Sequence, residues 1–143
     1  MAGASVTVTR ESRDIGGVWA AEVLMTLACV SDDANGLIPN QNINAQHEYV
    51  ITEVKPVPDA VTPVTSEFKI KIVGADGETI FLSSSIAVDS KAPMSGANHL
   101  GWYPRLDATA TLSIVDPADH TSTLSVGNAK KLGIVLRLEK KYS

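Results

Sequence analysis

Alternation of apolar and polar residues is the clearest pattern in the chain, and residues 67–82 show it best. Phe68, Ile70 and Ile72 are separated by charged residues, so one face of this segment is apolar and the other is charged. A period of two is typical of a half-buried β-strand. The sequence Gly-Ala-Asp-Gly then reverses the chain, and residues 79–82 return as a partner strand. This segment predicts a β-hairpin whose apolar face needs further strands to cover it.

The same alternation predicts strands elsewhere in the chain, separated by turn sequences and loops. The expected strands are residues 5–9, 49–54, 107–115, 124–126 and 132–138. The expected connections are a charged segment at 10–14, a polar surface loop at 37–46, and a long irregular loop at 91–104. Three prolines interrupt residues 56–64 and predict an extended connection or an edge there. Residues 83–89 fit either a bent edge strand or a short helical turn.

The segment Val18–Val30 fits both periods. As a helix, it would place Glu22 and Thr26 on one side, and its alanine, leucine and methionine residues favour helix. As a strand, it presents an unbroken apolar face at alternate positions from Trp19 to Cys29. We interpret it as a strand, because its neighbours are all strand-like.

About eight short strands at regular turn spacing predict an all-β fold, an antiparallel β-sandwich or a jelly-roll-like barrel. At 143 residues the chain is long enough to bury a core, and we expect a single β domain over 1–143 with short polar tails. The order of the strands in a sheet cannot be deduced from this pattern.

Composition excludes several classes of function. The formal net charge is −4 and the lysines and arginines are scattered, which argues against nucleic-acid binding. Cys29 is the single cysteine, so an intramolecular disulfide is excluded, and we expect it to be a small buried hydrophobe. No apolar run has the length of a membrane span, and the first five residues do not form a secretory signal. We therefore expect a soluble protein that is made in a cytoplasm and does not bind a membrane.

No catalytic, cofactor or metal site is indicated by a motif. His47, His99 and His120 fall in three separate predicted loops, without the spacing of a zinc site. The Asp-Gly-Glu sequence at 76–78 lacks the alternating ligands of a calcium loop. A nucleophile elbow, a phosphate loop and a dinucleotide fingerprint are all missing from the sequence. We predict that the chain is not an enzyme and needs no cofactor.

Trp102 and Tyr103 are the most prominent side chains in the predicted loops. Two large aromatics beside Gly101 and Pro104 are suited to stacking on a sugar or to anchoring a protein interface. The alternative is that they cover the open end of the core. Both interpretations remain open at this point.

The order of the predicted elements resembles that of small β-rich virion proteins of tailed bacteriophages. The resemblance is carried by four pieces: the long apolar strand Val18–Ser31 with its turn Asp32–Gly36, the hairpin Phe68–Leu82, the strand Asp107–Ile114, and the closing strand Leu132–Lys140. It covers most of the chain and implies a capsid decoration (cement) protein, assembled in the host cytoplasm and located in the virion. Such proteins carry no catalytic residues that could be transferred to this sequence.

The resemblance implies that the major capsid protein or another virion protein is the partner, and that the chain forms a homodimer or homotrimer. The loops would bridge neighbouring capsid subunits, and many weak contacts would add up to high avidity. The candidate interface residues are Leu37, Pro39, His99, Trp102, Tyr103 and Arg105. Two alternatives remain: a neck or tail component present in fewer copies, and a carbohydrate-binding β-sandwich in which Trp102 and Tyr103 stack on the sugar.

Overall fold

The computed structural model describes residues 4–14, 21–43, 49–97, 103–106 and 109–140. Within these ranges every regular element is a strand, which confirms the predicted all-β class. The strands are β1 (Ser5–Asp14), β2 (Ala21–Val30), β3 (Gln41–Asn42), β4 (Tyr49–Pro58), β5 (Lys69–Val73), β6 (Thr79–Leu82), β7 (Met94–Ser95), β8 (Arg105–Leu106), β9 (Thr111–Val115) and β10 (Lys131–Lys140). The described residues include no helix that is long and apolar enough to cross a membrane.

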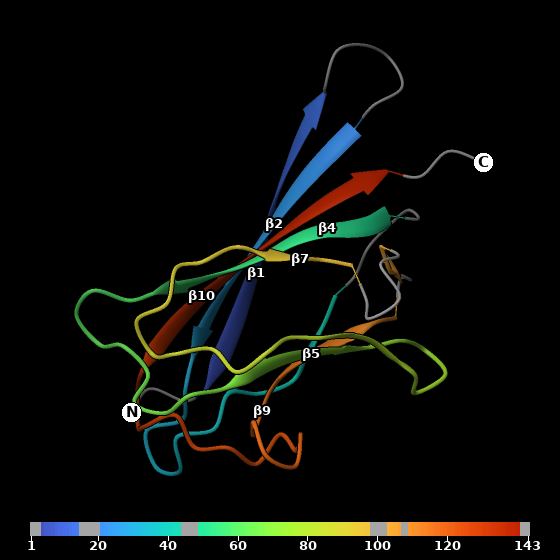
Figure 1. Ribbon diagram of the computed structural model, residues 1–143. Coiled ribbons are helices and arrows are strands. Elements are labelled where there is room, and N and C mark those ends of the chain that lie inside the picture. Colours follow the sequence, from blue (N-terminus) through green and yellow to red (C-terminus); the bar gives the residue numbers. More distant parts are fainter. Residues whose placement is uncertain (1–3, 15–20, 44–48, 98–102, 107–108, 141–143) are drawn as a thin grey trace.

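The strands form two antiparallel sheets that face each other. The larger sheet has six strands in the order β1-β2-β10-β4-β7, with β8 also paired to β4. The smaller has four strands in the order β3-β9-β5-β6. Figure 1 shows the long strands of the six-stranded sheet in one layer and β5 and β9 in the other, with the ends of β1, β2 and β10 reaching beyond the smaller sheet. The architecture is a β-sandwich.

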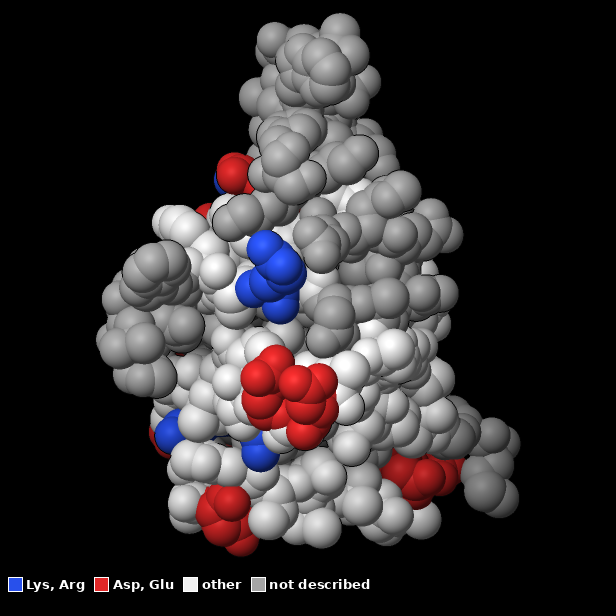
Figure 2. Space-filling view, turned by 90° about the vertical axis from the view of Figure 1, so that its right-hand side faces the viewer, with Lys and Arg blue, Asp and Glu red and all other residues white. Residues whose placement is uncertain are grey.

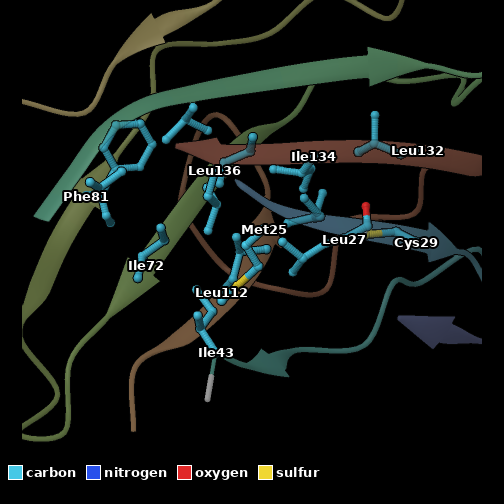
Figure 3. Packing of buried hydrophobic residues seen from close by; sticks show 14 of the residues in the cluster. Met25, Leu27, Cys29, Ile43, Ile72, Phe81, Leu112, Leu132, Ile134 and Leu136 are labelled. Carbon is cyan, nitrogen blue, oxygen red and sulfur yellow. The ribbon is translucent and has the colours of Figure 1, made fainter. Parts of the chain in front are cut away.

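The core lies between the two sheets and follows directly from the alternation in the sequence. Alternate residues of β2, from Val23 to Cys29, are buried, as are alternate residues of β10, from Leu132 to Leu138. The facing sheet contributes buried residues of β5 and β9, among them Ile72 and Leu112 (Figure 3). The strand interpretation of Val18–Val30 is therefore confirmed over Ala21–Val30, where every second side chain is enclosed by the opposite sheet.

Two strands are longer than the sequence pattern predicted. The charged residues 10–14 are not a connection, because β1 continues to Asp14 in unbroken register with β2. Strand β4 does not end before its prolines but runs to Pro58, with Pro56 and Pro58 paired to Ile134 and Leu132 of β10. Proline is tolerated in a strand where the missing N–H would point to the open side of the sheet. Beyond residue 54, β4 has no described partner except β10.

Other differences concern the loops. Residues 124–126 are not a strand: the Val126 amide donates to Gly36 O at 2.9 Å, while its carbonyl accepts from the Thr65 amide at 2.8 Å. These bonds join three separate segments and do not form a ladder. The predicted loops contain two short strands, β3 and β7, and Ile38 and Ile43 of the first loop are buried. The strand count is thus ten, compared with about eight predicted.

Candidate binding surface

The outer face of the six-stranded sheet carries a row of small side chains across three strands, near the end of β2 and the start of β10. Because Cys29 and Leu132 point inward, their neighbours Ala28 and Gly133 face outward. The registers place these two residues opposite each other and place Val57 of β4 on the other side of Gly133. Ala28 is exposed, and 42% of Val57 is exposed. Three strands that are distant in sequence therefore combine into one low, apolar row.

This row forms the floor of an open depression of about 360 Å³, which we name the Gly133 depression. Its apolar lining includes Ala28, Val30, Val57 and Gly133, and its charged lining is Asp59 and Lys131. The space exists because residue 133 has no side chain: a Cβ there would lie 3.1 Å from Val57 Cβ. The volume and the mostly apolar lining of this depression make it a candidate contact site for another molecule.

Asp59 supplies a fixed negative charge beside the depression. Its carboxylate accepts hydrogen bonds from the backbone N–H of Thr62 at 2.7 Å and of Val61 at 3.0 Å, and from the Thr62 hydroxyl at 3.1 Å. These bonds hold the pKa of Asp59 below its ordinary value of 3.8, with a smaller contribution from the charge of Lys131. The depression therefore has an apolar floor with one acidic and one basic group beside it.

On the face of the molecule in Figure 2, the described acidic and basic residues form several small groups, and in places the two signs lie next to each other. No continuous basic surface is visible among the described residues of that face. The described residues of that face therefore do not form the basic footprint of a polyanion-binding surface.

Two of the candidate interface residues, Tyr103 and Arg105, lie at the start of β4. Arg105 of β8 pairs with Val50, and the carbonyl of Pro104 accepts a hydrogen bond from the Ile51 amide at 3.0 Å. Pro104 is buried, whereas 53% of Tyr103 is exposed. Tyr103 is thus half exposed on a segment that is fixed to the sheet.

Two others, Leu37 and Pro39, follow the end of β2. The Leu37 amide donates to Asn35 Oδ1 at 3.1 Å, and its carbonyl accepts from the Asp32 amide at 2.9 Å. Leu37 is half-buried and Pro39 is exposed.

The structure does not bring these two pairs together. The end of β2 pairs with the start of β10, whereas the start of β4 pairs with the end of β10. They therefore lie at opposite ends of a ten-residue strand, a separation of roughly 30 Å. The remaining candidates, His99 and Trp102, lie outside the described residues.

The described ranges contain no candidate metal site. No three histidine, cysteine or acidic residues within those ranges lie close enough to hold a metal ion. His120 Nε2 is 3.3 Å from Lys69 Nζ, and His47 falls outside the described residues. Cys29 is buried, and burial raises the pKa of its thiol to about 12, so it stays protonated at neutral pH.

The Gly133 depression was not identified from the sequence. Its only signal there is that Ala28 and Gly133 occupy outward positions where larger polar residues are more usual. Their juxtaposition depends on the register of β2 with β10, which the alternation does not specify.

No protein-family model matches the chain, and a search of curated proteins found no match to it. The fold and its surface define an antiparallel β-sandwich with an open depression on one sheet.

Proposed function

We propose that the chain is a non-enzymatic structural protein of a tailed-bacteriophage virion: a capsid decoration protein that binds the major capsid protein on the head and stabilises the shell. The observation that carries this proposal is the Gly133 depression on the open face of the six-stranded sheet. A broad sheet face with a low apolar row suits contact with a large, folded partner. The predicted order of the strands, on which the resemblance to virion proteins rests, agrees with the all-β fold.

In this proposal, the depression receives one apolar side chain of a capsid subunit, and Asp59 and Lys131 fix the orientation of the contact. Burying apolar surface contributes roughly 25 cal/mol per Å² of affinity before the cost of association is subtracted. An acidic and a basic group at fixed positions beside the depression favour one orientation of the partner over others. Repetition over the shell turns a modest single contact into high avidity.

The test is the amount of this chain in particles sedimented from a lysate of the producing cells. A decoration protein is expected at a stoichiometry comparable to that of the major capsid protein. Val57→Asp places a charge beside the apolar floor and is expected to reduce the bound amount at least about tenfold, because a desolvated charge lacks a partner. Leu82→Asp is the matched control, since Leu82 is 37% exposed but lies on the other sheet.

If the chain is absent from particles that contain the major capsid protein, the virion proposal is wrong. If Val57→Asp and Leu82→Asp bind as well as the wild type, the depression is not the contact site. A small, fixed copy number per particle would instead indicate the alternative, a neck or tail component.

A carbohydrate-binding module is the second candidate, and the exposed ring of Tyr103 is the observation that favours it. Exposed aromatic rings stack on the apolar faces of sugars. This candidate predicts glycan binding that is lost in Tyr103→Ala and retained in Val57→Asp. Particle attachment that is unaffected by Tyr103→Ala, without glycan binding by the wild type, would reject it.

A further inference from the structure

Strand β1 is a long edge of the six-stranded sheet. All ten of its residues pair with β2 in continuous register, and no described strand pairs with its other side. An edge strand exposes a row of backbone donors and acceptors that can pair with another strand. Proteins usually blunt such edges with prolines, bulges, short strands or charged side chains. Strand β1 has no proline and its register has no bulge, and its four charged residues are all in the second half of the strand, over residues 10–14.

The other described edges are blunted. On the far side of the six-stranded sheet, β7 and β8 have two residues each, and the part of β4 that pairs with β10 alone among the described strands contains Pro56 and Pro58. In the four-stranded sheet, β3 has two residues, and β6 has four with a register shift against β5. Among the described strands, β1 is therefore the one long edge available for pairing.

The side chains of β1 also indicate a missing neighbour. Val6 and Val8 lie opposite the buried Cys29 and Leu27, so they face the core side of the sheet. They are nevertheless only half-buried, whereas Cys29 and Leu27 are 2% and 0% exposed. A further strand beside β1 would cover the open flank of both valines.

We propose that β1 is a dimer interface, in which β1 of a second copy pairs with it antiparallel about a two-fold axis and extends the six-stranded sheet across both copies. The second copy is favoured over another partner for three reasons. It offers an edge of the same length, and its strand carries two arginines, one glutamate and one aspartate, so the two strands do not repel each other by net charge. Pairing of the two copies also covers the long edge of each, so the assembly stops at a dimer and does not grow into a fibre.

The alternation restricts the register. In a continuous sheet, two residues that lie directly opposite each other point to the same face. Because side chains alternate along a strand, an odd-numbered residue of β1 can pair only with an odd-numbered residue of the second copy, and an even-numbered residue only with an even-numbered one. The numbers of two paired residues must therefore add to an even value. Pairing of all ten residues would match Ser5 with Asp14, whose numbers add to an odd value, so this register is excluded. The longest permitted registers place the axis at Thr9 or at Arg10. An axis at Arg10 would set two residues of like charge directly opposite each other, which is destabilising, so we place the axis at Thr9, where the two copies of Thr9 are direct neighbours.

This inference goes beyond the proposed function, because it concerns self-association and holds whether or not the chain binds a phage head. The experiment that tests it is cross-linking of Thr9→Cys with a short thiol-specific cross-linker. The native Cys29 does not interfere, because it is buried and its thiol stays protonated. Thr79→Cys, exposed on β6, is the matched control.

A covalent dimer is expected for Thr9→Cys, and monomer is expected for Thr79→Cys. Thr9→Lys brings two like charges together, so we expect it to raise the dissociation constant of the dimer at least about tenfold. Analytical ultracentrifugation over a dilution series measures this constant. Thr79→Lys is the control and is expected to leave it unchanged. Thr9 is exposed on the outer face, so both variants retain the monomer fold. A wild-type chain that stays monomeric at high concentration, or a dimer that Thr9→Lys does not weaken, would overturn the proposal.

Discussion

The hydroxyl of Ser31 donates a hydrogen bond of 2.6 Å to the carbonyl oxygen of Gly127, although the two residues are 96 positions apart. The same hydroxyl accepts a 2.7 Å hydrogen bond from the Lys130 amide, and the Ser31 amide donates to Lys130 O at 2.8 Å. Ser31 is completely buried. This side chain therefore ties the end of β2 to the turn that leads into β10.

Ser31→Ala is expected to lower the free energy of unfolding by about 1–3 kcal/mol, because it leaves a buried amide and carbonyl without their partner. Chemical denaturation monitored by fluorescence or circular dichroism measures this loss. Ser84→Ala is the control, since Ser84 is exposed, and it is expected to stay within about 0.5 kcal/mol of the wild type. Equal stabilities of the two variants would mean that the Ser31 hydroxyl has no structural role.

Gly96 holds the short strand β7 against β4. Its amide donates to Thr52 O at 3.0 Å, and a Cβ at this position would overlap the carbonyl of Ile51. Gly96→Ala is expected to cost about 1–3 kcal/mol, because the backbone must move to relieve the overlap. Thermal or chemical unfolding tests this.

Gly77 is the matched control for Gly96. It has a φ of 82° in the turn between β5 and β6, with nothing within 4 Å of an added Cβ. Asparagine tolerates this left-handed conformation, so Gly77→Asn is expected to change stability by no more than about 0.5 kcal/mol. A Gly96→Ala variant as stable as Gly77→Asn would show that β7 is not held in place by this contact.

Cys29 makes stability depend on pH in the alkaline range. Its folded-state pKa is raised from 9.0 to about 12 by burial, so the unfolded chain loses this proton first as the pH rises. The contribution is fully present below pH 9 and declines toward pH 12, by at most about 1.4 kcal/mol per pH unit. Denaturation at a series of pH values should show a shallower alkaline decline for Cys29→Ala than for the wild type. Parallel declines would contradict this, as would rapid labelling of the native thiol by iodoacetamide.

Asp59 has the opposite pH dependence. Hydrogen bonds from Thr62 and Val61 hold its folded pKa below 3.8, so its contribution to stability is present above that pH and is lost as the pH falls below it. Asp59→Ala is expected to be less stable than the wild type at neutral pH, and the difference should close in acid. Asp89→Ala, at an exposed position, is the control. A difference that persists unchanged in acid would show that the ionised carboxylate is not its cause.

The strands themselves were predictable, because alternation records which side chains face the core. The hairpin of Phe68, Ile70 and Ile72, the strand interpretation over the described residues 21–30, and the closing strand all follow from that pattern. The extent of β1 and β4 did not, because charged residues and prolines are read as breaks, yet an edge position tolerates both. Residues 124–126 alternate, but the pattern records burial, and Val126 is buried in a loop that bonds to two other loops.

The candidate surface was much less predictable. Ala28, Val57 and Gly133 become neighbours only through the pairing of β2 with β10 and of β10 with β4. The interface residues that the sequence predicts are therefore mainly prominent residues in loops, such as Tyr103. Leu37 and Arg105 of the predicted interface lie at opposite ends of the sheet, because the antiparallel pairing of β10 with β2 and with β4 places their segments there.

The place of β10 has a consequence for how the protein is made. It is the last described strand in the sequence, yet it lies in the middle of the larger sheet and pairs with both β2 and β4. On a ribosome, a nascent chain that has emerged only as far as residue 130 can form the β1–β2 hairpin but cannot connect it to β4. The larger sheet is therefore completed only after residues 131–140 have left the exit tunnel, and until then two long, hydrophobic strand edges are open to misassembly.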